Sequence, residues 1–252
     1  MLFMRIIVRA GHTETAGGAT ALLNELTEDR KVKDSVVKYL RALGHEVLDV
    51  TPPANTNLTI KGDLVYGVDK ANKWGGDLFV SIHFNKAYAS YNGAIGTEVC
   101  VYSKNDVAQR VVDAISGLGF KNRGQKVRNN LYELNSTKMK SMIVEVCFVE
   151  ATEDVALYRK LGADTIGKTI AEAIVGTKVQ AVSVSDNVEP SKEFVVRITA
   201  DVLNVRKEPN TSSSVVTTVK KGDAYTIVSS SGSWLKLKSG KGWIHSSYTQ
   251  KV

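Results

Sequence analysis

The sequence predicts an α/β domain, a mostly parallel sheet flanked by helices, followed by a small all-β barrel. Strand-like and helix-like segments alternate over residues 5–175, whereas short β-rich runs separated by turns follow residue 193. Between these regions, residues 176–193 show no hydrophobic period and contain Gly, Ser, Asp and Pro, a composition typical of linkers. The expected organisation is a domain at 1–175, a linker at 176–193 and a second domain at 194–252.

In the first domain, apolar runs of strand length lie at 5–9, 46–50, 77–83, 97–102 and 141–148. A helix is expected between the first two runs, because apolar residues recur at helical spacing and Gly44 follows as a C-cap; these residues are Val32, Val36, Val37, Leu40 and Leu43. Similar helical patterns occur near 61–74, 105–117 and 162–175. This alternation favours a largely parallel sheet with helices on its faces.

In the second domain, the β-rich runs lie at 194–198, 215–219, 225–228, 234–237 and 242–244. Turn residues separate them, as in Lys221-Gly222-Asp223 and Ser239-Gly240-Lys241. Short strands at this spacing predict a small barrel or sandwich.

Composition and charge narrow the classes of protein. The chain has 252 residues, 43% of them hydrophobic and 23% charged, which is ordinary globular composition. It contains no apolar run long enough for a membrane span, so membrane insertion is not expected. Cys100 and Cys147 lie far apart in apolar runs and are expected to be buried thiols. Arg5 and Arg9 interrupt the apolar start, which therefore predicts a first strand and no export signal.

The net charge of +7 is concentrated in the second domain, where residues 194–252 hold nine basic and three acidic residues. Such an excess favours a polyanionic partner, although a lysine-rich soluble surface explains it equally well. Basic barrels with aromatic residues also bind single-stranded nucleic acid, but a nucleic-acid partner is not expected here.

Two of the four histidines follow apolar strands. His12 comes after the first strand and His83 ends the third. In open α/β sheets, catalytic and ligand groups gather beyond the carboxyl ends of strands. A single histidine placed in this way is usually structural, whereas two of the four histidines at strand ends can converge, which raises the chance that they are ligands.

Two carboxylates extend this pattern. Glu145 is flanked by apolar strand residues, where a carboxylate is costly to bury unless it is paired or used. Glu25 opens the first helical pattern, and Glu28 is its rival. Two histidines and a glutamate with an open fourth position form a catalytic zinc set, and a further glutamate can take the proton of the attacking water. Structural salt bridges remain the alternative for both glutamates.

At this point residues 5–175 resemble the zinc-dependent N-acetylmuramoyl-L-alanine amidases, the type-3 family of bacterial autolysins and phage endolysins. The motifs that carry the resemblance are Gly11-His12, the glutamate opening the first helix, Ser81-Ile82-His83-Phe84-Asn85, Leu131-Tyr132-Glu133-Leu134 and Ile143-Val144-Glu145-Val146-Cys147-Phe148. The chain departs from the family pattern at Phe84, at Lys140-Ser141 and at Glu150-Ala151.

The resemblance implies one Zn²⁺ bound by His12, Glu25 and His83, with Glu145 as the general base. It implies hydrolysis of the amide between the lactyl group of muramic acid and L-alanine. Asn85 and Asn135 are expected to contact the substrate, with turn formation as the alternative role for both.

The second domain resembles bacterial SH3-like domains. The blocks Leu203-Asn204-Val205-Arg206, Val219-Lys220-Lys221-Gly222-Asp223, Ser233-Trp234-Leu235 and Gly240-Lys241-Gly242-Trp243 occur in that family's order. The resemblance implies binding to cell-wall peptidoglycan, with wall teichoic polymers as a further partner of the basic surface. Trp234, Trp243 and Tyr248 are candidate ligand contacts, although aromatic residues in so small a barrel are as often core.

The leading hypothesis is therefore a peptidoglycan amidase, and the absence of an export signal favours a phage or prophage endolysin. Such an enzyme would wait in the host cytoplasm until a separate pore-forming protein releases it to the wall. The alternatives are a host autolysin or sporulation amidase of the same chemistry, a wall-binding protein with an inactive amidase domain, and a zinc peptidase of different bond specificity.

Overall fold

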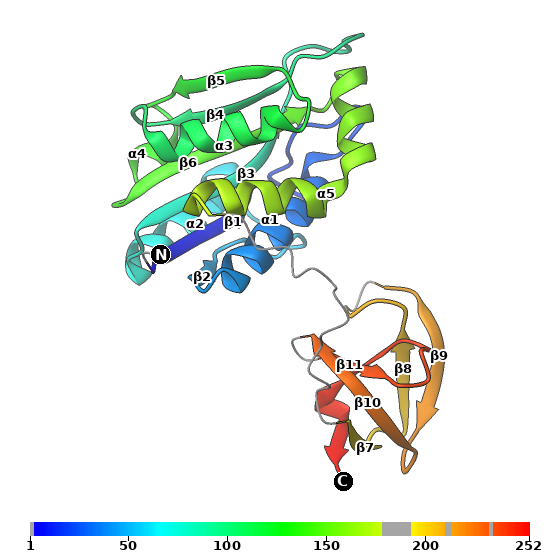
Figure 1. Cartoon of the computed structure of the whole chain (residues 1–252). Coiled ribbons are helices and arrows are strands. Elements are labelled where there is room, and N and C mark those ends of the chain that lie inside the picture. Colours follow the sequence, from blue (N-terminus) through cyan, green and yellow to red (C-terminus); the bar gives the residue numbers. More distant parts are fainter. Residues whose placement is uncertain (1–2, 178–192, 210–212, 232–233) are drawn as a thin grey trace. The chain divides into compact units, whose positions relative to one another are not determined.

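The computed structural model describes residues 3–177, 193–209, 213–231 and 234–252, and the chain divides into two compact units, Met1–Val179 and Gln180–Val252 (Figure 1). Each unit has a hydrophobic core of its own. The expected linker at 176–193 lies, except for its first two residues and its last, outside the described residues.

The first unit is built on a six-stranded sheet in the order β2-β1-β3-β6-β4-β5. The strands are β1 (Arg5–Ala10), β2 (Glu46–Asp49), β3 (Leu78–Asn85), β4 (Thr97–Val101), β5 (Asn122–Val127) and β6 (Lys140–Phe148). Strands β2, β1, β3 and β6 are parallel, β4 runs antiparallel to β6, and β5 is parallel to β4. The prediction of a mostly parallel sheet is confirmed.

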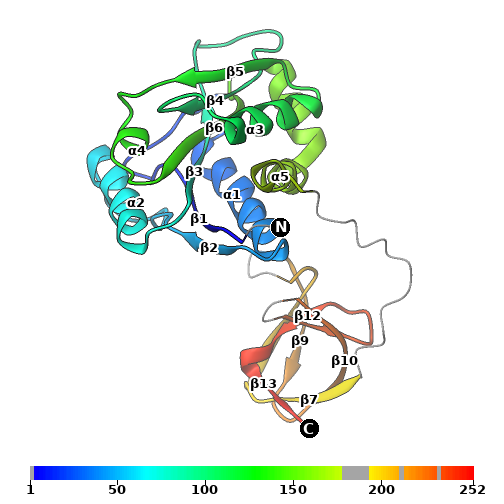
Figure 2. The same cartoon turned by 60° about the vertical axis from the view of Figure 1, so that its left-hand side comes forward.

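Helices cover both faces of this sheet (Figure 2). One face carries α1 (Glu25–Ala42), α3 (Asp106–Gly117) and α5 (Thr152–Val175), whose apolar side chains form the main core with β1, β3 and β6. The other face carries α2 (Ile60–Trp74) and the short α4 (Tyr132–Asn135), which pack against smaller apolar clusters. The carboxyl ends of β1 and β3 therefore lie side by side between two helical layers.

In the first unit, the sequence prediction missed β5 and the short α4, and it placed the start of α5 too late. Strand β5 has the polar sequence NRGQKV and is half exposed at the sheet edge, so it lacks the apolar signal of a core strand. Helix α5 begins at Thr152, ten residues before the helical pattern starts, and Gly162 interrupts it with a φ of 77°.

The second unit is an antiparallel seven-stranded sheet in the order β13-β7-β10-β11-β12-β8-β9. Its elements are β7 (Phe194–Ile198), β8 (Val202–Arg206), β9 (Val215–Lys220), β10 (Ala224–Ser231), β11 (Trp234–Leu237), β12 (Trp243–His245), the 3₁₀ turn η1 (Ser246–Tyr248) and β13 (Thr249–Lys251). Alternate inward residues of these strands form the core, among them Val196, Leu203, Val205 and Ile227. The prediction of a small all-β domain is confirmed.

Two smaller expectations concern the cysteines and membrane spans. Cys100 and Cys147 are buried, with exposed fractions of 4% and 0%, as expected for core thiols. Over the described residues, no helix combines the length and the apolar character of a membrane-crossing segment.

Candidate active site

The site lies where β1 and β3 end and where α1 begins. His12 follows β1 by two residues, and His83 lies near the end of the neighbouring strand β3. Glu25 is the first residue of α1, whose N-cap Asn24 accepts a hydrogen bond from the Thr27 N–H. The structure thus brings together three side chains that are separated by 13 and 58 residues along the chain.

His12 is held in an uncommon backbone conformation. Its φ is 66°, in the left-handed region, and among the described residues it is the one non-glycine residue with a positive φ. Such a conformation costs about 1 to 3 kcal/mol and is often kept at functional sites. The ring Nδ1 lies 3.1 Å from the Ala16 carbonyl, which can only accept, so Nδ1 carries the hydrogen. The Nε2 lone pair then faces Glu25 Oε1 at 3.3 Å.

Glu25 is buried, with 3% of its surface exposed, and both carboxylate oxygens are engaged. Oε2 accepts from the Ala19 N–H at 2.6 Å, and Oε1 accepts from the Phe84 N–H at 2.9 Å. Burial opposes the ionised form, but the close approach of the His12 and His83 rings outweighs it and holds the pKa of Glu25 well below its usual range. Glu25 is therefore ionised in the fold.

His83 faces the same carboxylate oxygen from the other side. Its Nδ1 lies 3.0 Å from Glu25 Oε1, while its Nε2 lies 2.9 Å from the Ser81 hydroxyl. Burial opposes a charged imidazole, but Glu133 and Glu25 raise the pKa of His83 well above its usual value. The ring stands edge-on to His12, with centroids 5.0 Å apart.

The three groups fit a zinc ion. One ligand atom from each of His12, Glu25 and His83 lies within 4.8 Å of the others. Two imidazole lone pairs directed at one carboxylate oxygen repel each other unless a positive charge lies among them. Neutral histidines with a carboxylate, and space for a further ligand, are the donor set of a catalytic zinc site.

Glu145 lies beside this cluster on β6. It is directly opposite His83 in the parallel register of β3 and β6, so both side chains leave the same face of the sheet. Its Oε2 is buried and has no hydrogen-bond partner among the described residues. Burial, together with the nearby Glu25, Glu98 and Glu133, raises the pKa of Glu145 to about 7, although His83 opposes the rise.

The rival carboxylate Glu28 is engaged elsewhere on α1. It accepts a hydrogen bond of 2.7 Å from the Tyr158 hydroxyl and forms an ion pair of 2.7 Å with Lys31. Among the described residues, the cluster that can hold a metal ion includes Glu25 and not Glu28.

The two asparagines lie in different places. Asn85 ends β3, two residues after His83, and its amide donates to Glu98 Oε1 at 3.2 Å. Asn135 ends α4 and lines a pocket with Lys140 and Ser141, at the amino end of β6. The structure therefore places Asn85 near the histidines and Asn135 at the opposite end of the strands. Contact of either residue with substrate stays a prediction.

A buried ionic group, for which the sequence predicted no role, lies behind His83. Arg9 in β1 contacts Asp63 of α2 at 2.9 Å and Glu133 of α4 at 3.0 Å, and all three side chains are buried. Glu133 in turn accepts from the Ser81 hydroxyl at 3.1 Å. An arginine inside an apolar strand is a signal in itself, because a buried guanidinium requires carboxylate partners.

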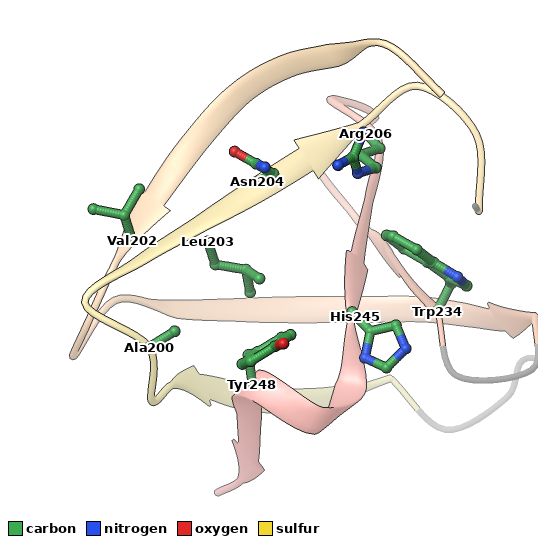
Figure 3. A pocket seen from close by; sticks show the side chains of 8 residues that line it. All are labelled: Ala200, Val202, Leu203, Asn204, Arg206, Trp234, His245 and Tyr248. Carbon is green, nitrogen blue, oxygen red and sulfur yellow. The ribbon is translucent and has the colours of Figure 1, made fainter. Parts of the chain in front are cut away.

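The second unit has a pocket of about 440 Å³, shown in Figure 3. It is lined by Ala200, Val202, Leu203, Asn204, Arg206, Trp234, His245 and Tyr248. Arg206 and Trp234 lie toward one end of the pocket and Val202 toward the other (Figure 3). Trp243 is outside the lining, with Lys236 5.7 Å above its ring. Of the three aromatic candidates, the pocket therefore includes Trp234 and Tyr248.

Comparison with known proteins gives a separate family match for each of the two units. Residues 6–176 match the N-acetylmuramoyl-L-alanine amidase family, and residues 201–250 match the bacterial SH3 domain family. An uncharacterized protein of Clostridium perfringens is 46% identical over 192 residues, which cover 74% of this chain and 55% of that protein. The chain spans about half the length of the two Clostridium perfringens relatives that it matches.

Two endolysins are also similar. The endolysin of Bacillus phage SPP1 is 31% identical over 166 residues, which cover 60% of this chain and 57% of the endolysin. The catalytic domain of the CD27L endolysin, which targets Clostridia difficile, is 28% identical in sequence with a TM-score of 0.62, covering 70% of this chain and 99% of that domain. Because the amidase match covers more than half of the sequence, the chain belongs to the N-acetylmuramoyl-L-alanine amidase family, and it carries a bacterial SH3 domain after it.

Proposed function

We propose that this protein is a zinc-dependent N-acetylmuramoyl-L-alanine amidase that cleaves bacterial peptidoglycan between the lactyl group of muramic acid and L-alanine. The observation that carries this proposal is the convergence of His12, Glu25 and His83, with Glu145 in register beside them. Membership of the amidase family supports the same bond specificity.

The metal ligands and Glu145 would have different roles in the proposed hydrolysis. His12, Glu25 and His83 would hold one Zn²⁺, which supplies Lewis-acid polarisation of the scissile carbonyl and of the attacking water. Glu145 has a pKa of about 7, so at neutral pH it can accept a proton from water and return it to the departing amine of alanine.

The test uses two variants of the full chain on purified cell walls. Glu145→Gln is expected to keep bound zinc and to lower the rate of lysis by about 10²- to 10⁴-fold, since it removes the proton acceptor. His83→Ala is expected to lose zinc, measured as metal content. Mass analysis of wild-type products should show new N-terminal alanine and free muramic lactyl ends. Equal activity of the wild type and Glu145→Gln, or cleavage at another bond, would end the assignment.

We further propose that the SH3 domain holds the enzyme on the wall. Its pocket offers an aromatic wall at Trp234 and Tyr248 and a guanidinium at Arg206, which suits a wall fragment with apolar and anionic groups. Lysines of this domain, such as Lys220, Lys221 and Lys241, would attract wall teichoic polymers by long-range forces. Tethering to an insoluble substrate raises the effective concentration without changing the chemistry.

A phage or prophage endolysin is the proposed biological role, supported by the similarity to two endolysins. In this proposal the protein stays in the host cytoplasm until a separate pore-forming protein releases it to the wall. A host autolysin or sporulation amidase is the alternative. Expression in the host without a pore-former should leave the walls intact, and lysis or secretion under those conditions would contradict the endolysin role.

A further inference from the structure

The strongest unexplained feature of the first unit is the guanidinium of Arg9, whose exposed fraction is 0%. Arginine does not give up its proton in proteins, so this charge stays inside the fold and needs carboxylate partners. Asp63 and Glu133 supply them from two different helices, at 2.9 Å and 3.0 Å. Gly67 of α2 leaves the space, because a Cβ there would lie 2.7 Å from Arg9 Nη1.

The two carboxylates differ in what else they contact. Asp63 is bound by Arg9 through both of its oxygens, at 3.0 Å and 2.9 Å, and in the described part of the chain its side chain bonds to neither histidine. Glu133 accepts the Ser81 hydroxyl at 3.1 Å through Oε1, and its Oε2 lies 3.5 Å from His83 Nε2. Of the two carboxylates that pair with Arg9, Glu133 is thus the one that lies beside His83, a proposed zinc ligand.

The direction of the hydrogen bonds follows from the donors available. Glu133 is paired with a permanent cation, so it is ionised and can only accept. The Ser81 hydroxyl gives its single hydrogen to Glu133 and must therefore accept from His83 Nε2, which lies 2.9 Å away. His83 then carries its proton on Nε2, and the lone pair of Nδ1 is directed at the metal position beside Glu25.

We propose that Glu133, fixed by Arg9 and acting through Ser81, is a positioning residue that sets the tautomer and the ring orientation of His83 for metal binding. An outer carboxylate of this kind orients a histidine ligand and increases its basicity. The inference rests on the proposed zinc function for the identity of the ion. The alternative is a purely structural ion cluster, in which Asp63 and Glu133 would be equivalent.

The closing experiment compares Glu133→Gln with Asp63→Asn in the full chain. Each variant removes one carboxylate from the same buried arginine, so both are expected to lose similar amounts of unfolding free energy. Zinc affinity, measured by competition with a chelator, is expected to fall about 10- to 100-fold for Glu133→Gln and to stay close to the wild-type value for Asp63→Asn. Equal shifts in zinc affinity, or an unchanged affinity for Glu133→Gln, would overturn the proposal.

A second measurement covers the case in which Glu133→Gln does not fold. Nitrogen NMR of wild-type protein without zinc, recorded at a pH high enough for the His83 ring to be neutral, should show that neutral ring protonated on Nε2. Ser81→Ala, which leaves the ion cluster intact, should increase the other neutral tautomer and weaken zinc binding. A neutral wild-type His83 ring protonated on Nδ1, or a Ser81→Ala variant with unchanged tautomer and affinity, would also overturn the proposal. Failure of the wild type to bind zinc would refute the proposed function, whereas the tautomer would still test the role of Glu133.

Discussion

Two glycines at the site show how closely the ligands are packed. A Cβ at Gly18 would lie 2.5 Å from Glu25 Oε2 and 2.6 Å from His12 Cδ2, both inside normal contact distance. A Cβ at Gly11 would overlap the ring of His83. The space for the zinc ligands is therefore created by residues that lack side chains, which is why glycine adjoins His12 in the sequence.

Gly18→Ala tests this packing directly. The added methyl must displace Glu25 or His12, and a displacement of about 1 Å at a metal site costs about 10² in affinity or rate. Zinc affinity and wall lysis are therefore expected to fall together. Gly17→Ala is the matched control, because a Cβ at Gly17 meets nothing within 4 Å. Full zinc binding by Gly18→Ala would show that the loop adjusts and that the glycine is not required.

At the scale of elements, an ion pair joins α1 to the end of β2. Lys33 is buried, with 6% of its surface exposed, and its Nζ lies 2.6 Å from Asp49 Oδ2. Burial alone would raise the pKa of Asp49, but hydrogen bonds from Lys33 and Thr51 lower it below its usual value. Because the folded pKa is lower than the unfolded one, the pair stabilises the fold above about pH 4, and this contribution is lost as the pH falls through the folded pKa.

Asp49→Asn should therefore lower the unfolding free energy at pH 7 by about 1 to 3 kcal/mol, and the difference from wild type should shrink below about pH 4. Urea unfolding at pH 7 and pH 3 measures both values. Asp34→Asn is the control, since Asp34 also contacts Lys33 but its side chain is 72% exposed, where an ion pair contributes about 0 to 1 kcal/mol. Equal losses for the two variants would contradict the role given to the pair of buried Lys33 and partly exposed Asp49.

Local pattern predicted the strands with apolar runs well and missed strands such as β5 and β8. The strands β1, β3 and β6 are apolar runs buried on both faces, so their composition marks them. Strand β5 lies at the edge and β8 carries alternating exposed and buried residues, so neither has a continuous apolar run. The antiparallel direction of β4 is set by its pairing with β6, which no local pattern encodes.

At the scale of the whole molecule, the chain has two units with separate cores, to which we have assigned the proposed catalysis and the proposed wall binding. A chain ending at residue 177 is expected to sediment less with purified walls and to cleave soluble fragments at the rate of the full chain. The wall binding of the full chain should also weaken with salt, because surface charges are screened over about 10 Å at 0.1 M. Unchanged sedimentation of the shortened chain would contradict the tethering role.

A point variant locates that binding within the SH3 domain. Tyr248 lines the pocket and is 50% exposed, so Tyr248→Ala should weaken wall sedimentation while it leaves the core of the domain intact. Val215→Ala is the control, because Val215 is similarly exposed at 46% and lies outside the pocket lining. Equal binding by the two variants would place the wall contact elsewhere on the domain.

The sequence by itself determined the apolar strands of the first unit, the helices that alternate with them, and the positions of His12 and His83 after apolar strands, because these follow from local periodicity and composition. From composition it also predicts a division near residue 176. The tertiary structure decided that Glu25 and not Glu28 joins the histidines, since each faces a different neighbour: His83 in β3 for Glu25, Tyr158 in α5 for Glu28. It also brought Arg9, Asp63 and Glu133 together from three elements. Such contacts depend on how strands pair and how helices pack across the sheet. The spacing of residues along the chain predicts neither the pairing nor the packing.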